Sequence, residues 1–491
     1  MQRPAVADWA PLATLALVLG AFLVLHISSF EMLVWDEAEY ASIGRSLARG
    51  EGYRVGDQVE YLRPPVLPFS IAASLLAFGE NGDAIAKLPS VAYTLLLVAA
   101  VYAFLLRDGG RVAALAGAVA VAVSPELAVC GVRLLSEMPF MVFYSTAVLA
   151  FAFGFERHPR WFYVSWLAFA LALSTRYTAL LFAPTVAIAI GFELMRDRRH
   201  ALALLRSRRF LVAPFVAALP LLTPWYLRQW LGTGDPLSGI RYASNQIPSY
   251  VSASMPWHFY LSALPKALTW PILAVGVAGL LHALATRRRL GVYSAAAAFV
   301  VIAWHSQYDY KEVRLMLPAL PFFAVGVGFA TAAWRTGRAS AWERRALPAT
   351  LLAAAALLGY RDIHATLEGE IALGEPSFLN AMEYVRNRLP ADDALIAAAF
   401  PQTNWYADRP TRRTPPTVDL LLEELDSVEW VVITNFERSE PDYLRAIYED
   451  LRWSDRFREE VQIFATSPFQ TVLARSDWVR RKLRPAASGE R

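Results

Sequence analysis

Two adjacent carboxylates, Asp36 and Glu37, directly follow the first long apolar run of the chain. Helix capping by Asp36 is one explanation for the pair, because acidic residues suit the positive end of a helix. The apolar residues Tyr40, Ile43 and Leu47 recur at helical spacing. They predict a helix that lies on the bilayer or on neighbouring helices. A carboxylate fixed at its start would point into a cavity between helices, where it can act as a general base.

A basic residue, Arg63, closes the same loop and precedes two prolines. The prolines stiffen the backbone, and the nearby Pro68 can start an apolar helix that ends near Gly79. We expect Arg63 to lie at the membrane surface, either as an interfacial anchor or as a cation that contacts substrate.

A second acidic site is Glu137, in the sequence Ser136-Glu137-Met138-Pro139. An ionisable group at membrane depth costs roughly 2.5–3.5 kcal/mol at a helix centre, so such groups tend to be functional. Helix capping is the alternative. Arg176 is expected in the next turn on the same side, within reach of the same cavity.

A third site contains Lys311 and Arg314, one helical turn apart and therefore on one face. Two cations at a membrane surface can clamp a phosphate, and arginine offers a bidentate fork. Contact with lipid headgroups is the alternative.

Composition indicates that a membrane surrounds these residues. Of the 491 residues, 56% are hydrophobic and only 18% are charged, below the roughly 25% of an average soluble domain. The net charge of +4 does not indicate nucleic-acid binding, because the arginines fall in short clusters between apolar runs. The single cysteine, Cys130, excludes a disulfide framework within the chain.

Apolar runs long enough to cross a bilayer predict about eleven transmembrane helices, since one span needs about 20 residues. The expected spans begin near Pro11, Ala84, Val112, Glu137, Trp161, Thr178, Phe210, Leu261, Gly291, Leu315 and Ala346. The run from Pro11 to Phe30 is expected to be a retained first helix rather than a cleaved signal peptide.

Arginine placement predicts the orientation. With the N-terminus in the cytoplasm, every dense basic cluster falls on the cytoplasmic side, including 196–209, 287–289 and 335–345. An odd number of spans then places the C-terminal part outside. Four arginines in the first outer loop oppose this bias, which the loop's length of about fifty residues tolerates.

The predicted domains are a transmembrane catalytic domain at residues 1–360 and an extracytoplasmic α/β domain at residues 361–491. In the second domain we expect strands at Leu395–Phe400, Val428–Thr434 and Val461–Ala465, and helices at Asn380–Arg388 and Tyr443–Trp453. The basic tail from Arg480 is expected to fray. This domain contains no catalytic motif, which favours a docking or lid function.

The order and spacing of these motifs resemble the C-type (GT-C) glycosyltransferases, over residues 1–360. The carboxylates Asp36 and Glu37 after the first span, followed by Arg63-Pro64-Pro65, are most similar to protein O-mannosyltransferases of family 39 and to the aminoarabinose transferases that modify lipid A. Glu137 lies where these enzymes more commonly have aspartate. The sequence Lys311-Glu312-Val313-Arg314 resembles their late basic motif.

The resemblance implies an inverting sugar transfer from a polyprenyl-phosphate donor to an acceptor hydroxyl outside the cytoplasm, at a plasma membrane. Asp36 would be the general base, and Glu37 and Glu137 would orient it or the acceptor. The donor phosphate would be bound by Arg63, Arg176, Lys311 and Arg314. Tyr40, on the same predicted helix as Asp36, would also contact substrate. The acceptor would be a lipid, a glycan or a protein.

Metal and cofactor motifs are absent from the sequence, so no cofactor is expected and the cations themselves would stabilise the leaving phosphate. Two alternatives remain. One is a transporter or flippase of a lipid-linked or small polar substrate, for which the repeats and mid-membrane broken helices typical of transporters are missing. The other is a metal-dependent oligosaccharyltransferase acting on asparagine, which would be expected to have more acidic ligands in its outer loops.

Overall fold

The computed structural model describes residues 5–80, 82–249, 255–336, 353, 356–368, 376–436, 441–449, 459–466 and 469–487. The chain divides into two compact units, each described here by itself. The helical unit contains Met1–Ser29, Tyr61–Leu67 and Lys87–Glu370, and the sheet unit contains Phe30–Glu60, Pro68–Ala86 and Ile371–Arg491. The first long loop therefore groups with the C-terminal part, and the predicted boundary at residue 360 stays a prediction.

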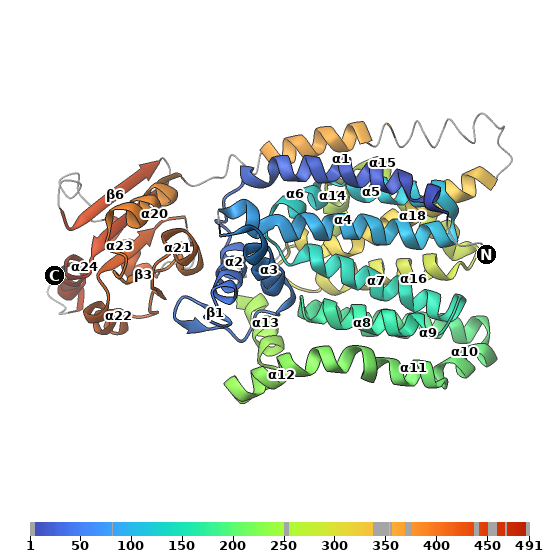
Figure 1. Ribbon diagram of the computed structural model, residues 1–491, viewed down its shortest axis with the longest axis horizontal. Helices are drawn as coiled ribbons and strands as arrows, with labels where there is room; N and C mark the ends of the chain where they lie inside the picture. Colours follow the sequence, from blue (N-terminus) through green and yellow to red (C-terminus); the bar gives the residue numbers. More distant parts are fainter. Residues whose placement is uncertain are drawn as a thin grey trace. The chain divides into compact units, whose positions relative to one another are not determined.

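Long apolar helices dominate the helical unit (Figure 1). Its helices are α1 (Ala10–His26), α4 (Asp83–Asp108, whose first turn belongs to the sheet unit), α5 (Gly110–Ala122), α6 (Pro125–Val132), α7 (Glu137–Glu156), α8 (Trp161–Leu173), α9 (Phe182–Arg196), α10 (Arg198–Leu205), α11 (Arg208–Ala213), α12 (Leu219–Thr233), α13 (Ser238–Ser249), α14 (Phe259–Leu268), α15 (Trp270–Ala285), α16 (Arg289–Ser306), α17 (Val313–Met316) and α18 (Leu320–Thr336). Short η segments connect several of them, including η3 (Tyr177–Leu181) and η4 (Pro214–Ala218).

Six helical segments in the described part of the chain are long and apolar enough to cross a membrane. They are Val6–Ser29, Asp83–Asp108, Glu137–Glu156, Tyr177–Arg196, Arg208–Thr233 and Val313–Trp334. The number rises to eight if two bent pairs each form one span, namely Gly110–Ala122 with Pro125–Val132 and Phe259–Leu268 with Trp270–Ala285.

The expected spans correspond closely to observed helices. Ten of the eleven predicted starts lie within two residues of a helix start. The eleventh, at Ala346, lies outside the described residues. The total of about eleven spans exceeds the six to eight because breaks divide some runs and because helices such as Trp161–Leu173 are shorter than a full span.

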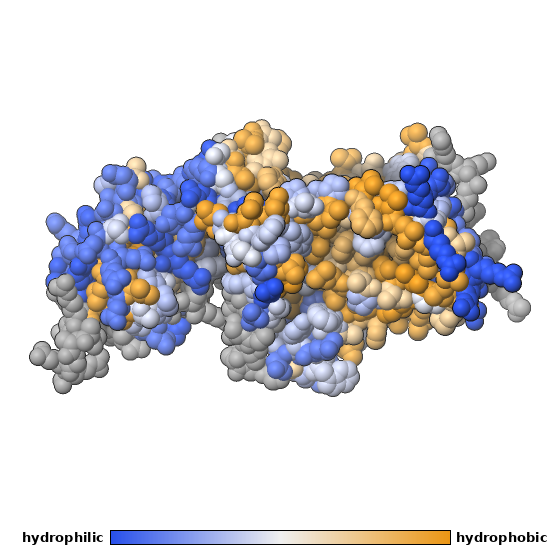
Figure 2. Space-filling model, turned by 90° about the horizontal axis from the view of Figure 1, so that it is seen from below, coloured by the Kyte–Doolittle hydropathy of each residue, from blue (hydrophilic) through white to orange (hydrophobic). Residues whose placement is uncertain are grey.

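Apolar side chains lie on the outside of these helices as well as inside. Leu25, Phe215 and Leu231 are 78%, 67% and 78% exposed, respectively. Figure 2 shows the corresponding apolar surface in orange over the long helices, with polar residues gathered at the helix ends. Such apolar side chains are more stable in hydrocarbon than in water. The helices can lie in hydrocarbon because their backbone groups are paired within each helix.

Helices α15 and α18 pack with their backbones in contact. A Cβ atom added to Gly279 would lie 1.8 Å from the carbonyl oxygen of Gly326, and one added to Gly326 would lie 2.2 Å from that of Gly276. Only glycine permits this approach, which is the small-residue packing typical of membrane helices.

The sheet unit has a five-stranded mixed sheet in the order β4-β3-β5-β7-β6. Its strands are β3 (Leu395–Ala397), β4 (Thr411–Arg413), β5 (Trp430–Thr434), β6 (Val461–Thr466) and β7 (Phe469–Arg475). Strand β3 pairs in parallel with β4 and β5, whereas β7 runs antiparallel to β5 and β6. The three predicted strands are present, and β4 and β7 were not predicted.

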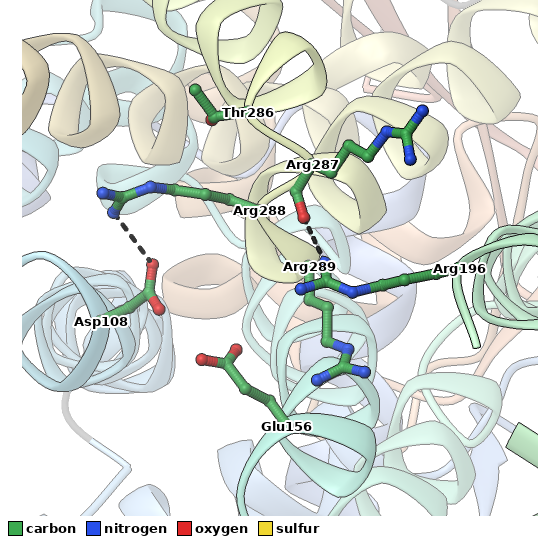
Figure 3. A pocket seen from close by; sticks show the side chains of 7 residues that line it. All are labelled: Asp108, Glu156, Arg196, Thr286, Arg287, Arg288 and Arg289. Carbon is green, nitrogen blue, oxygen red and sulfur yellow. Dashed lines mark hydrogen bonds and ion pairs between the residues drawn. The ribbon is translucent and has the colours of Figure 1, made fainter. Parts of the chain in front are cut away.

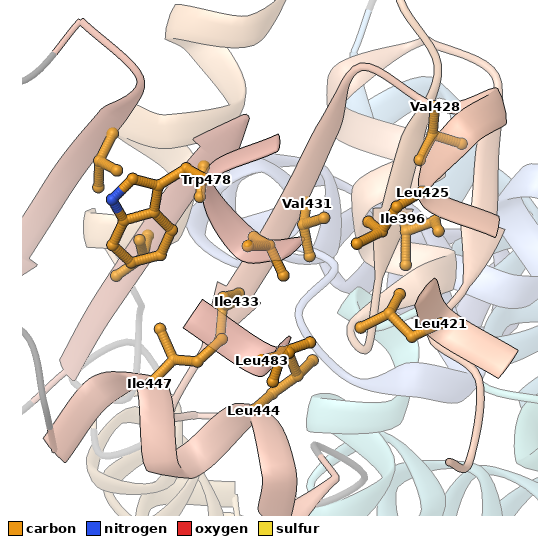
Figure 4. Close-up of a cluster of buried hydrophobic side chains, with 14 residues drawn as sticks. Ile396, Leu421, Leu425, Val428, Val431, Ile433, Leu444, Ile447, Trp478 and Leu483 are labelled. Atoms are coloured by element: carbon orange, nitrogen blue, oxygen red, sulfur yellow. The ribbon is translucent and has the colours of Figure 1, made fainter. Parts of the chain in front are cut away.

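Alternate residues of β5 face two separate apolar cores, as a strand's period of two requires. Val431 and Ile433 join the cluster in Figure 4, together with residues of α22 (Val418–Glu424), α23 (Asp442–Glu449) and α24 (Ser476–Ala487). Trp430 and Val432 join a second cluster with residues of α20 (Pro376–Arg388) and α21 (Phe400–Ala407).

The expectation that the tail frays from Arg480 is wrong for the described residues. Helix α24 continues to Ala487, and its residues Trp478, Val479 and Leu483 are buried in the first of these cores. Their spacing places them on one helical face, so apolar burial fixes the segment despite its basic composition.

The first loop adds two helices and a small hairpin to the sheet unit. These are α2 (Trp35–Ala48), α3 (Val66–Phe78, whose first two residues belong to the helical unit), β1 (Arg54–Val55) and β2 (Gln58–Val59). Helices α2 and α3 meet at Gly44, where an added Cβ would lie 2.4 Å from the Ile71 side chain.

Candidate active site

Glu137 is the first residue of α7 and is 1% exposed. Its Oε1 lies 2.5 Å from the Arg176 guanidinium, which also donates a 3.0 Å hydrogen bond to the hydroxyl of Ser136. Glu137 Oε2 is buried and accepts no hydrogen bond from the described residues. An acceptor left unpaired in a protein interior costs free energy, so this oxygen is a candidate for contact with a substrate.

A second cation approaches the same carboxylate from another segment. The Arg314 guanidinium lies 4.0 Å from Glu137 Oε1, and Arg314 also pairs with Glu312. The structure thus brings Glu137, Arg176 and Arg314 together, as the sequence predicted. We refer to these three residues as the Glu137 cluster.

Lys311 is buried close to Arg314 in sequence, but its ammonium group is directed to main-chain oxygens. It donates hydrogen bonds to the carbonyls of Met255, at 2.9 Å, and of Tyr308. Lys311 therefore stabilises the loop before α17, in addition to any function in substrate binding.

The segment that carries Arg63 is tied to the turn that carries Arg176. The Tyr177 hydroxyl donates a 2.8 Å hydrogen bond to the Leu62 carbonyl, and the Val66 amide donates to the Ser174 carbonyl at 3.0 Å. This places the backbone on both sides of Arg63 beside the η3 turn.

Sequence analysis missed a polar anchor on α12 that holds the same segment. The Gln229 side chain is buried and donates hydrogen bonds to the Tyr61 carbonyl, at 2.9 Å, and to the Tyr177 hydroxyl, at 3.0 Å. A glutamine inside an apolar run was the available signal.

Asp36, Glu37 and Tyr40 lie on α2, in the sheet unit. The N-cap residue of α2 is Val34, so Asp36 lies in the first turn and does not cap the helix, which was the alternative explanation for this residue. Glu37 and Tyr40 are 0% and 3% exposed. Convergence of Asp36 with the Glu137 cluster stays a prediction.

Helix α2 is held within the sheet unit by a buried arginine. Arg45 donates hydrogen bonds of 2.8 Å and 2.5 Å to the main-chain carbonyls of Trp405 and Asn404 on α21, and its guanidinium stacks on the Trp405 ring. Burial lowers the pKa of Arg45 to about 10, although the charge of Asp408 opposes the shift. These contacts compensate the desolvation of the buried Arg45 charge and fix the position of α2 on α21.

Two further contacts fix the same region of the sheet unit. Arg49 pairs with Glu80 at 2.6 Å and with Asp408 at 2.9 Å. Asp83, at the start of α4, accepts hydrogen bonds from the Trp405 indole at 2.8 Å and the Tyr406 hydroxyl at 2.5 Å. Burial, together with the charge of Asp83, raises the pKa of Tyr406 far above its usual value, so this phenol stays protonated.

Among the described residues, no group of three or more His, Cys, Asp or Glu side chains is placed to hold a metal ion. The Glu137 cluster places two guanidinium groups beside one buried carboxylate, and guanidinium groups can bind a phosphate.

Comparison with protein families gives one match. Residues 62–227 match the sequence model of the family described as dolichyl-phosphate-mannose-protein mannosyltransferase. This stretch contains Arg63, Glu137 and Arg176 and covers about a third of the chain. No curated protein sequence matches the chain.

Comparison with solved structures shows the fold. ArnT from Cupriavidus metallidurans, in a crystal structure bound to undecaprenyl phosphate, matches with a TM-score of 0.75 at 15% identity, over 96% of this chain and 98% of that one. The oligosaccharyltransferase of Archaeoglobus fulgidus in the apo form matches with a TM-score of 0.61 at 12% identity, over 87% of this chain and 69% of that one.

The fold is therefore that of a polytopic α-helical membrane protein of the GT-C type with a small sheet-containing part at its C-terminal end. The chain is thus similar to the protein O-mannosyltransferase family over residues 62–227 and shares its fold with ArnT.

Proposed function

We propose that this protein is a membrane glycosyltransferase that moves a sugar from a polyprenyl-phosphate donor to an acceptor hydroxyl, with inversion at the sugar carbon. The family match over residues 62–227 and the fold shared with an ArnT that binds undecaprenyl phosphate support this class of reaction. The acceptor is a lipid, a glycan or a protein.

The observation that carries the proposal is the Glu137 cluster. A buried carboxylate faces Arg176 at 2.5 Å and Arg314 at 4.0 Å, and Glu312 pairs with Arg314, so two guanidinium groups lie beside two carboxylates. A donor phosphate that enters this site can accept charge-assisted hydrogen bonds from the two guanidinium groups. Preorganised cations stabilise the charge that develops on a leaving phosphate without help from a metal.

In the proposed reaction Asp36 accepts the proton of the acceptor hydroxyl as that oxygen bonds to the anomeric carbon. The bond between the anomeric carbon and the phosphate oxygen breaks, and polyprenyl phosphate leaves. Its negative charge is taken up by Arg176, Arg314, Lys311 and Arg63. Glu37, Glu137 and Tyr40 orient the acceptor and the donor.

The proposed location is the plasma membrane, with the N-terminus in the cytoplasm and the sheet unit outside. The dense arginine clusters of the sequence support this orientation, because they all fall on one side when the predicted spans alternate. A lipid-linked donor would then reach the site from the outer leaflet.

Substitution of the proposed base tests the function. Purified Asp36→Asn protein, incubated with lipid extracts that contain polyprenyl-phosphate sugars, should lose sugar transfer while it keeps its fold. The loss should be at least about 100-fold, the usual contribution of a general base. Mass spectrometry of glycolipids and glycans measures the product.

The matched control is Glu51→Gln, which also replaces a carboxylate by an amide, at an exposed position beyond the end of α2. This variant should transfer sugar at the wild-type rate. Full activity of Asp36→Asn would remove Asp36 as the base. Movement of the lipid across proteoliposomes without any transfer would replace the proposal with a lipid transporter.

A further inference from the structure

A pocket of about 250 Å³ lies in the helical unit at the ends of several helices, and its residue Glu156 is at the opposite end of α7 from Glu137. It is lined by Asp108, Glu156, Arg196, Thr286, Arg287, Arg288 and Arg289 (Figure 3). This volume is several times the roughly 30 Å³ that one water molecule occupies in the liquid. The pocket therefore has room for a compact polar group.

The lining has an excess of positive charge, with four arginines against two carboxylates. The charges are not all neutralised in pairs. Arg289 is committed to Glu193, at 2.8 Å and 2.9 Å, and Arg196 donates to the carbonyl of Arg287. Arg288 lies 4.0 Å from Asp108, which is a loose ion pair.

The turn between α15 and α16 has an arginine in the left-handed backbone region, which is unfavourable for any residue with a Cβ atom. The Arg288 amide bonds to the Ala283 carbonyl and the Arg287 amide to the Leu284 carbonyl, which is the Schellman ending of a helix. Glycine is the usual residue at the left-handed position of this motif, but here Arg287 occupies it with φ of 52°. Arg287 makes no hydrogen bond or ion pair through its side chain with the described residues.

The pocket lies where candidate membrane spans end. Three candidate spans end at residues that line it, namely at Asp108, Glu156 and Arg196. Leu284 and Met195, which are close in sequence to residues that line the pocket, are 42% and 83% exposed. A molecule that places an anionic group in the pocket can therefore lay an acyl chain along α15 and α9.

We propose that this arginine pocket binds the phosphate-bearing headgroup of an anionic phospholipid. Guanidinium groups bind phosphate oxygens through paired, charge-assisted hydrogen bonds. Basic pockets between membrane helices are suited to anionic headgroups. The site is separate from the proposed sugar-transfer site, and the proposal does not depend on the enzymatic activity.

Titration of the full-length protein in detergent with phosphatidylglycerol tests the proposal, with native mass spectrometry to count bound lipid and a thermal shift to report stabilisation. Arg287→Gly together with Arg288→Gln should weaken binding about fivefold for each arginine removed, or roughly 25-fold for the pair. Arg287→Gly alone should leave the unfolding temperature unchanged or higher, since glycine suits the left-handed position. A variant that weakens binding without loss of stability separates ligand contact from folding.

Two further variants make the test specific. Arg208→Gln with Arg209→Gln removes two exposed arginines near the start of α11, outside the pocket, and should bind lipid like the wild type. Glu156→Gln removes a carboxylate from the lining and should tighten binding several-fold. Equal losses in the pocket pair and in the control pair would overturn the proposal, as would unchanged binding in the pocket pair.

The source of the phosphate is decided by a parallel titration with inorganic phosphate. Stabilisation by phosphatidylglycerol that inorganic phosphate cannot reproduce supports a lipid site. Stabilisation by inorganic phosphate alone, with no retained phosphatidylglycerol, would overturn the lipid assignment in favour of a free anion.

Discussion

The guanidinium of Arg176 lies 2.5 Å from the carboxylate of Glu137, although the two residues are 39 positions apart in the chain. Glu137 is almost fully buried, so Arg176 supplies charge that the fold requires. Removal of one partner from a buried pair leaves an uncompensated charge, whereas removal of both need not destabilise the protein.

We therefore expect Arg176→Ala to destabilise the protein by about 3 kcal/mol. The double variant Arg176→Ala with Glu137→Gln should recover most of that stability but not the sugar transfer. Thermal unfolding and transfer rates of the two single variants and the double variant form a double-mutant cycle. Equal stability losses in the single and double variants would argue against direct pairing.

Arg314 should determine how tightly the donor phosphate binds. Arg314→Lys keeps the charge but loses the bidentate fork, so KM for the lipid-phosphate donor should rise about tenfold. Arg241→Lys is the matched control, because Arg241 is an exposed residue of α13 whose ion pair with Asp235 should tolerate the change. Steady-state kinetics against donor concentration measure both variants, and an unchanged KM in Arg314→Lys would remove Arg314 from the donor site.

The contact between α15 and α18 predicts that alanine at Gly279 lowers the stability of the protein, whereas alanine at Gly191 does not. Gly279→Ala would place a Cβ atom 1.8 Å from the Gly326 carbonyl oxygen, so the helices must separate. We expect a loss of about 1–3 kcal/mol, typical of overpacking. Gly191→Ala on α9 meets no atom within 4 Å and should be neutral or slightly stabilising. Thermal unfolding of both variants in the same detergent distinguishes packing from helix propensity.

The Asp408 carboxylate should make the sheet unit sensitive to acid. Burial raises the pKa of Asp408, but the hydrogen bond from Arg49 and the charge of Arg45 outweigh burial and hold the pKa below its usual value. A lowered pKa in the folded state adds stability that is fully present above the ordinary aspartate pKa of about 4. That stability is lost as the pH falls through the lowered value.

Asp408→Asn should therefore reduce stability at neutral pH and flatten the fall in stability with acid. Hydrogen exchange of α21 amides, measured from neutral to acidic pH, reports the change. Asp419→Asn, at an exposed position on α22, controls for the loss of one negative charge. If the stability of Asp408→Asn falls with acid as much as that of the wild type, Asp408 is excluded as the group responsible for the fall.

The sequence by itself determined the class of fold and most element positions. Apolar runs of membrane length predicted helix starts at ten of eleven positions to within two residues, because burial in hydrocarbon demands long, internally paired helices. Charged residues beside these runs marked Glu137, Arg176 and Arg314 as candidates, because an ionisable group at membrane depth is costly and tends to be functional. Short strands such as β4 and β7 escaped prediction, since three to seven residues give little periodicity.

Only the tertiary structure decided which of these residues are partners. The pair formed by Glu193 and Arg289 joins α9 to α16, and Arg45 joins α2 to α21 more than 350 residues later. The arginine pocket likewise gathers side chains from the ends of four helices and one turn. Sequence records which residues carry charge, but the pairing of distant charges depends on how helices pack, and packing is set by side-chain shape across the whole core.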